Sequence, residues 1–195
     1  KEACASVKGS TIPMACELSD PKSVRACVAD VKAQGLELDA IIANAGIMAL
    51  PKLEKAFGYE VQFFTNHIGH FMLVTGLLEQ LTEEGRVVML SSAAHTQAPK
   101  TGIEFDNLSG DREYGAWKMY GQSKLANLLF AKELARRFAG TKKTANAVHP
   151  GVIRTNLGRH MNPVANVVFG LVGPLVLKTV PQGAATEVYV AASPK

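Results

Sequence analysis

Cysteine is scarce in this chain, and the residues that commonly bind metals are not spaced as metal ligands. The three cysteines, Cys4, Cys16 and Cys27, show no pairwise ligand spacing. They indicate free thiols in a reducing compartment rather than a disulfide framework. His67 and His70 lie three residues apart, but no third ligand accompanies them at a recognisable spacing. We therefore predict no metal site, and packing or surface roles are favoured for both histidines.

Charge of one sign is not concentrated anywhere in the sequence. The chain has 21 lysines and arginines against 17 acidic residues, and the resulting net charge of +4 is scattered. No basic stripe interleaved with aromatic residues occurs, which argues against nucleic-acid binding. A modest positive field is suited to an anionic ligand such as a nucleotide phosphate.

Long hydrophobic runs are also lacking. The most apolar stretch, from Val164 to Val180, is interrupted by Gly170, Gly173, Pro174 and Lys178. It is shorter than the roughly 20 apolar residues that a membrane-spanning helix needs. Residues 1–30 show no basic segment followed by an apolar core and a cleavage site. We expect no membrane span and a cytoplasmic protein.

Apolar runs and helical patterns alternate along the chain, which is 47% hydrophobic and able to bury a core as one domain over residues 1–195. We predict strands at 11–16, 38–43, 86–90 and 144–148. Helices are predicted from Pro21 to Gly35, from Glu54 to Leu81, around Tyr120 and from Gln182 to Tyr189. This alternation predicts an α/β fold with a doubly wound parallel sheet, Rossmann-like, in three α/β/α layers.

Tyr120 and Lys124 lie four residues apart in a predicted helix, so their side chains share one face. A phenol titrates near pH ~10 when unperturbed. A neighbouring ammonium lowers that pKa toward the range useful for acid–base catalysis. Taken alone, the spacing is more typical of a solvated helix edge than of a catalytic pair.

Three other polar positions follow predicted strands directly. Asn44, Ser92 and the pair Pro150-Gly151 come after three successive strands. In parallel sheets, ligands bind beyond the carboxyl ends of the strands. We therefore expect these positions to converge with the Tyr120 helix on one edge of the sheet.

The order of these motifs along the sequence resembles that of the short-chain dehydrogenase/reductase family. The matching elements are Asn44-Ala45-Gly46, Asn66, Ser92, Tyr120-x-x-x-Lys124, and Pro150-Gly151 with Thr155. The resemblance covers essentially the whole chain. The runs 91–95 and 123–127 look like the retinol-dehydrogenase and protochlorophyllide-reductase-like branch.

The resemblance implies an oxidoreductase that transfers a hydride between a nicotinamide cofactor and a carbonyl or alcohol, which we expect to be hydrophobic. Tyr120 would exchange the proton with the substrate oxygen. Lys124 would lower the Tyr120 pKa and hydrogen-bond the nicotinamide ribose. Ser92 would stabilise charge on the substrate oxygen, and Asn66 would support a proton relay through water.

The resemblance also implies a cofactor site, with NADP expected from the branch and NAD as the alternative. Thr155 and the backbone after Pro150-Gly151 would contact the nicotinamide amide. Glu17 stands where the family usually has aspartate near the adenine. A homo-dimer or homo-tetramer is implied as well. The full set of implied cofactor-binding residues is Glu17, Leu18, Asn44, Ala45, Gly46, Tyr120, Lys124, Pro150, Gly151, Val152 and Thr155.

The family's glycine-rich phosphate loop is absent from these residues, and so is a closing strand after Pro194. In the strand order 3-2-1-4-5-6, the missing first and second strands would lie between segments 11–16 and 38–43. We expect the chain to be part of a longer protein, partial at both ends. A true truncation, which we expect to be unstable and unable to bind cofactor, is the alternative, and intact mass distinguishes the two.

Plainer roles exist for each of these residues. Ser92 could cap a turn, Asn44 could form one, and Asn66 could lie on an exposed helix face. His95 could border the substrate pocket, and the segment from Met161 to Val180 could cover it. For the whole protein, the alternatives are a non-catalytic cofactor-binding or scaffolding relative and, third, a metal-dependent hydrolase.

Overall fold

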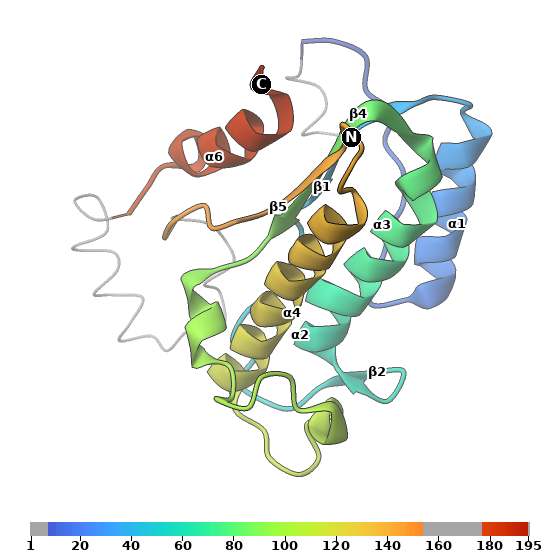
Figure 1. The fold of residues 1–195 in the computed structure, drawn as a ribbon. Coiled ribbons are helices and arrows are strands. Elements are labelled where there is room, and N and C mark those ends of the chain that lie inside the picture. Colours follow the sequence, from blue (N-terminus) through green and yellow to red (C-terminus); the bar gives the residue numbers. More distant parts are fainter. Residues whose placement is uncertain (1–7, 154–176, 195) are drawn as a thin grey trace.

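The computed structural model describes residues 8–153 and 177–194. Figure 1 shows a short parallel sheet with helices on both of its faces. Along the chain, the elements are α1 (Pro21–Ala33), β1 (Leu38–Ala43), β2 (Lys55–Ala56), β3 (Tyr59–Glu60), α2 (Val61–Phe63), the π-helix η2 (Phe64–Gly69), α3 (His70–Leu77), the 3₁₀ turn η3 (Leu78–Gln80), β4 (Leu81–Leu90), the 3₁₀ turns η4 (Ala93–Gln97) and η5 (Phe105–Asn107), α4 (Ala116–Arg137), β5 (Thr144–Val148) and α6 (Val180–Ala192).

The sheet has three strands in the order β1-β4-β5, and all pairs are parallel. Central strand β4 pairs Val88 with Ile42 on one side and with Asn146 on the other. Three successive β4 residues, Val87, Val88 and Met89, are fully buried, as expected of a strand covered on both faces. The predicted α/β class and its parallel sheet are therefore confirmed.

Helices α3 and α4 cover one face of the sheet, and α6 lies across the other (Figure 1). The core on the α3/α4 side is formed by Ile41, Ala43, Val74, Leu77, Leu81, Val87, Met89, Phe130, Ala131, Leu134 and Ala145. On the opposite face, Arg86 Nη1 donates to the carbonyl of Val190 at 3.1 Å, which ties β4 to α6. Helix α1 packs along the outside of α3.

The start of α1 follows the capping signal in the sequence. Asp20 Oδ1 accepts a hydrogen bond from the Lys22 amide at 2.9 Å, and Pro21 occupies the first turn. Gly35, with φ +65°, follows the helix in the left-handed conformation. The prediction for this helix is confirmed at both ends.

The predicted strand at 11–16 is wrong for the structure. These residues have no regular secondary structure and join none of the strand pairs among the described residues. A strand is stable only when its backbone groups are paired with a neighbour. The predicted strand order already leaves this segment without an adjacent strand.

The predicted helix from Glu54 to Leu81 is also wrong at its start and end. A small hairpin, β2–β3, turns at Phe57-Gly58, where both residues have positive φ. The helical segment begins only at Val61, where the Glu60 carboxylate accepts the Phe63 amide at 2.8 Å. It ends before Leu81, where β4 starts, so Gly85 lies inside a strand instead of closing a helix.

We expect Gly69→Ala to destabilise the protein. Gly69 ends η2, and a Cβ atom there would lie 2.3 Å from the Leu18 carbonyl oxygen, so the backbone would have to move. Overpacking of this kind costs about 1–3 kcal/mol. Urea denaturation measures the loss. Gly115→Ala is the control, because its added Cβ would meet only the Lys118 side chain at 3.3 Å; an equal loss in both variants would contradict the argument.

Candidate active site

Tyr120 and Lys124 both face the interior from the same side of α4. Tyr120 is 4% exposed and Lys124 only 3%. The Lys124 Nζ atom lies 5.6 Å from the centroid of the Tyr120 ring. A solvated helix edge is thereby excluded, since a lysine is almost never buried unless it has a specific partner or role.

Lys124 is held at the carboxyl end of the central strand. Its Nζ donates to the carbonyl of Leu90, the last residue of β4, at 3.1 Å. Burial lowers the pKa of Lys124 to about 8, and the carboxylate of Glu187 on α6 opposes this shift. The ammonium group therefore titrates near neutral pH, where a catalytic group is most effective.

The pKa of Tyr120 differs from the sequence expectation, which was a lowering by Lys124. Burial raises the pKa of Tyr120, and a hydrogen bond from the Ser92 side chain acts in the opposite direction. Desolvation of the phenolate outweighs the stabilising groups in this structure. The expected lowering is therefore wrong for the protein as it stands.

Ser92 has both of the roles considered for it. It ends the strand and caps η4, with Oγ accepting the Ala94 amide at 3.2 Å. Because that contact uses only an acceptor site, the hydroxyl proton remains for Tyr120 or a substrate oxygen. Next to it, His95 donates through Nδ1 to the Ser92 carbonyl at 2.7 Å, so His95 does border this position.

Asn66 is fully buried in η2, so an exposed helix face is excluded for it. Its Oδ1 accepts the Ile47 amide at 2.9 Å, and its Nδ2 donates to the Ile47 carbonyl at 2.9 Å and to Ser123 Oγ at 3.0 Å. The side chain thus joins the turn after β1 to α4. A π-helical turn at this residue is consistent with the frequent occurrence of such turns at functional sites.

Gly46 packs closely against the side chain of Asn66. A Cβ at Gly46 would lie 2.9 Å from Asn66 Oδ1 and 3.7 Å from Lys124 Nζ. A side chain at position 46 would therefore collide with the Asn66 amide, whereas the Lys124 ammonium lies at ordinary contact distance. Asn44 and Ala45, directly after β1, are exposed at the same strand ends. The residues present therefore fit a group that approaches the backbone closely and hydrogen-bonds Lys124.

The remaining predicted cofactor residues come from the segments before α1 and after β5. The Glu17 carboxylate accepts from the Ser19 amide at 3.0 Å and hydroxyl at 2.7 Å, and these bonds lower the pKa of Glu17. Leu18 is buried. After β5, Pro150 and Gly151 form a turn with φ +92° at Gly151, and Val152 is exposed. Thr155 and residues 161–176 of the predicted covering segment lie outside the described residues.

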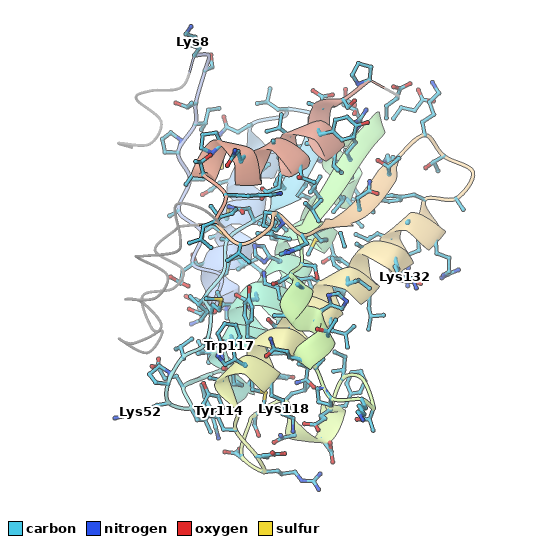
Figure 2. The ribbon with its side chains drawn as sticks, turned by 90° about the vertical axis from the view of Figure 1, so that its left-hand side faces the viewer. Lys8, Lys52, Tyr114, Trp117, Lys118 and Lys132 are labelled. Atoms are coloured by element: carbon cyan, nitrogen blue, oxygen red, sulfur yellow. The ribbon has the colours of Figure 1, made fainter. Side chains whose placement is uncertain are left out.

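Several site residues were missed by the sequence reasoning. Ser91 Oγ donates to the Lys124 carbonyl at 2.8 Å and so ties β4 to α4. Gly121 allows α4 to approach η4, because a Cβ there would lie 2.5 Å from the Ala94 carbonyl oxygen. Trp117, 40% exposed, meets the Tyr120 ring edge-on at 6.0 Å; Figure 2 labels it near the start of α4. Only the helical spacing of Trp117 and Tyr120 could have indicated that contact.

His70 is buried and His67 is half-buried, and both are hydrogen-bonded within the protein. Their Nδ1 atoms contact Asn127 Oδ1 at 3.0 Å and the Asn66 carbonyl at 2.9 Å. Burial lowers the pKa of each, that of His70 to about 4. Among the described residues, no group of three or more His, Cys, Asp or Glu side chains could hold a metal ion.

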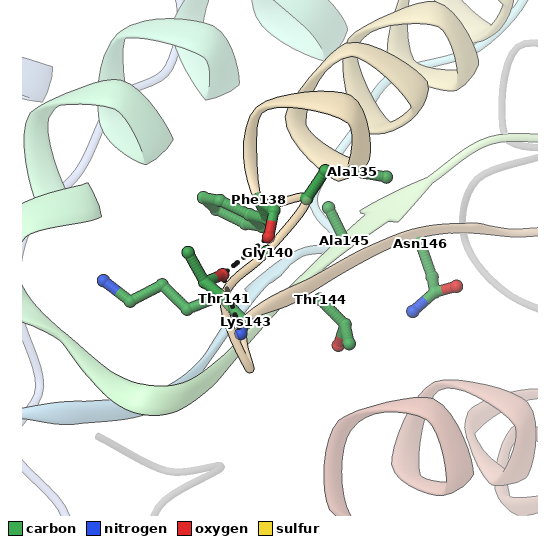
Figure 3. A pocket seen from close by; sticks show the side chains of 9 residues that line it. Ala135, Phe138, Gly140, Thr141, Lys143, Thr144, Ala145 and Asn146 are labelled. Carbon is green, nitrogen blue, oxygen red and sulfur yellow. Dashed lines mark hydrogen bonds between the residues drawn. The ribbon is translucent and has the colours of Figure 1, made fainter.

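A cavity of about 330 Å³ lies at the other end of the sheet (Figure 3). It surrounds the turn between α4 and β5 and is lined by residues such as Phe138, Thr141 and Asn146. Ser92 and Pro150 stand at the carboxyl ends of β4 and β5, whereas this turn precedes β5. The cavity is therefore separate from the Tyr120 cluster.

Comparison with known proteins places this arrangement among dehydrogenases. The short chain dehydrogenase family matches residues 1–165. Human retinol dehydrogenase 14 is 40% identical over 191 residues, covering 96% of this chain and 56% of that protein. The chloroplastic short-chain dehydrogenase TIC 32 A of Brassica napus is 43% identical over 187 residues, covering 91% of this chain and 58% of the relative. The chain thus spans little more than half the length of these relatives.

Solved structures share the fold. The 3-alpha-hydroxysteroid dehydrogenase from Pseudomonas sp. B-0831, complexed with NADH, superposes with a TM-score of 0.72 at 21% identity, covering 91% of this chain and 75% of that one. A short chain dehydrogenase from Burkholderia cenocepacia J2315 in complex with NADP gives 0.67 at 24% identity, covering 90% and 67%. Within the described residues, no helix has the length and apolar character needed to cross a membrane.

We expect Lys124→Met to stabilise the protein at pH 7. The folded-state pKa of Lys124 is about 8 against an ordinary 10.5, so the unfolded chain binds more protons between these values. The cost of burying the ammonium is therefore fully present below pH 8 and is relieved as pH rises to 10.5. Removing the charge should add about 1–3 kcal/mol to the free energy of unfolding at pH 7, and less at pH 10.

Urea denaturation at the two pH values measures this difference. Lys132→Met, at an exposed position of the same helix, is the matched control and should change stability little at either pH. A Lys124→Met variant that is less stable than the parent at pH 7 would show that the hydrogen bond to Leu90 outweighs the desolvation of the charge.

Proposed function

Because this chain belongs to the short chain dehydrogenase family, we propose that its protein is an NAD(P)-dependent oxidoreductase acting on a hydrophobic carbonyl/alcohol pair. The observation that carries the proposal is the cluster of three buried residues, Asn66, Tyr120 and Lys124, with half-buried Ser92 at the carboxyl end of β4. A non-catalytic relative of the same fold would have no need to keep a lysine buried at a cost in stability.

When bound, the nicotinamide cofactor supplies or accepts the hydride. During reduction, Tyr120 donates its phenolic proton to the substrate oxygen as negative charge develops there. Ser92 donates a hydrogen bond to the same oxygen and stabilises that charge. During oxidation, the same two groups act in reverse, and Tyr120 accepts the proton of the alcohol.

Lys124 has two tasks in this proposal. One of its protons is engaged by the Leu90 carbonyl, so two remain for the ribose hydroxyls of the cofactor and for the space near Tyr120. Its charge stabilises the phenolate that forms when Tyr120 gives up a proton. Neutral Lys124 cannot do so, and reduction should therefore slow as pH rises through about 8.

We propose NADP as the cofactor, with NAD as the alternative. Similarity to retinol dehydrogenases supports NADP through the branch of the family, whereas the related structures contain NADP in one case and NADH in another. The exposed indole of Trp117 beside the Tyr120 ring supports a hydrophobic carbonyl compound as the substrate. A cytoplasmic location and a homo-dimer or homo-tetramer complete the proposal; Cys16 and Cys27, both free thiols, suit a reducing compartment.

We expect Tyr120→Phe to abolish turnover while leaving cofactor binding largely intact, because the substitution removes only the proton donor. Purified protein of full natural length is assayed with NADPH or NADH and a panel of aldehydes, ketones and retinoids, following the nicotinamide absorbance. A loss of more than about 10³-fold in kcat is expected. Tyr189→Phe, at an exposed position on α6, is the control. Turnover by Tyr120→Phe at the parent rate would refute the mechanism.

We expect Glu187→Gln to move the alkaline limb of the pH–rate profile to lower pH. The Glu187 carboxylate raises the pKa of Lys124, so its removal lets Lys124 lose its proton earlier. The profile for aldehyde reduction measures the position of the limb. Glu79→Gln, which removes an exposed carboxylate in η3, should leave the profile unchanged. A limb that moves to higher pH in Glu187→Gln would contradict the electrostatic argument.

A further inference from the structure

Asn127 lies three residues after Lys124 in α4 and is fully buried. Its Nδ2 donates to two backbone carbonyls from different elements, Asn66 in η2 and Leu90 at the end of β4, both at 3.0 Å. A single amide group therefore connects the strand, the π-helical turn and the catalytic helix. Nothing in the proposed chemistry of Tyr120, Ser92 and Lys124 accounts for this side chain.

The contacts fix which way the Asn127 amide points. Both carbonyls can only accept, so the NH₂ group must face them and Oδ1 must face His67. His67 Nδ1 lies 3.0 Å from Oδ1 and must then carry a proton. All hydrogen-bonding positions of the Asn127 side chain but one oxygen lone pair are engaged, and a rotated amide would lose the hydrogen bonds to both carbonyls.

The Leu90 carbonyl is the acceptor that Asn127 shares with Lys124. It receives Asn127 Nδ2 at 3.0 Å and Lys124 Nζ at 3.1 Å, which uses both of its lone pairs. The ammonium group is thus anchored to an oxygen whose own position is held by Asn127. Displacement of that oxygen would move Nζ away from Tyr120.

The Asn66 carbonyl is occupied in the same manner. It accepts Asn127 Nδ2 at 3.0 Å and His70 Nδ1 at 2.9 Å. The side chain of Asn66 is likewise engaged by Ile47 and Ser123. Both amide protons and the backbone carbonyl of Asn66 are therefore engaged, and Asn66 holds the turn in which Asn127 finds its second acceptor.

We propose that Asn127 is a positioning residue of the catalytic site, whose two amide protons hold the Leu90 and Asn66 carbonyls so that Lys124 stays in its working position. The inference rests on the proposed function. A leucine of similar volume would fill the same space, but it would leave two buried carbonyl contacts unmade. The requirement is thus for a hydrogen-bond donor at position 127, and kcat should depend on it.

Two variants test the requirement in protein of full natural length, with NADPH and the aldehyde from the panel that the parent reduces. Asn127→Leu should lower kcat about 10- to 100-fold at saturating NADPH, with the KM for the aldehyde changed less than about twofold, because neither Asn127 nor Lys124 is proposed to bind the aldehyde. Asn127→Asp presents a carboxylate to the two carbonyls at neutral pH and should be as slow. On acidification it gains one O–H donor, so its kcat should recover at least about fivefold toward pH 5.5, whereas that of the parent should not.

Asn107→Asp is the matched control. Asn107 is also a buried asparagine with a carbonyl acceptor and a backbone amide donor, Glu113 and Arg112, both at 3.0 Å, but it lies in the loop before α4. It should lose stability without any change in the pH profile of kcat. Rates are normalised to the fraction of protein that binds NADPH. If Asn127→Leu does not fold, the pH profile of Asn127→Asp tests the inference by itself.

Parent-like kcat and pH profiles in the Asn127 variants would overturn this inference and leave the proposed function standing. Loss of kcat in Asn127→Asp without recovery at low pH would also overturn it, since a purely structural role predicts that result. Failure of the parent to oxidise NADPH with every compound of the panel would contradict the proposed function and the inference together.

Discussion

The site depends on a cation kept inside the protein. Lys124 has lost nearly all contact with water, and its ammonium group donates a hydrogen bond to the carbonyl at the end of β4. Its desolvation costs stability, and the Asn127 amide connects the end of β4, the π-helical turn and α4 around it by hydrogen bonds to the Leu90 and Asn66 carbonyls. Because the ammonium is desolvated, its pKa falls to about 8, which brings it into the range where it can serve proton transfer.

The geometry around Lys124 follows from the parallel sheet. Ser91, Ser92 and the Leu90 carbonyl stand at the end of the central strand, so α4 must cross that end closely for Lys124 to reach them. Gly121 permits the approach toward η4, and Ser91 bonds the helix backbone. Tyr120 then meets Ser92 on one side and Trp117 on the other. Apart from the contact of Tyr120 with Trp117 within α4, these contacts join elements that are distant in sequence, so the cluster exists only when the sheet is formed.

Local signals predicted the elements well where they were strong. The Asp20-Pro21 cap gave the start of α1, and the apolar runs gave β1 and β5. Prediction was wrong where pairing decided the outcome. Segment 11–16 has the composition of a strand but no partner strand. The Phe57-Gly58 turn forms a hairpin inside the range 54–81, for which a helix was predicted. Periodicity describes one segment at a time, whereas a strand needs a second one.

The sequence by itself determined the family, the α/β class and the order of Asn66, Ser92, Tyr120 and Lys124, because these depend on residue types and spacings that a chain carries in any conformation. Tertiary structure alone decided that Lys124 is buried, that burial raises the pKa of Tyr120, and that Asn127 shares the Leu90 carbonyl with Lys124. Desolvation and shared acceptors arise only when distant segments meet. The spacing of Tyr120 and Lys124 places two groups on one helix face, and packing against β4 and η2 determines what those groups can do.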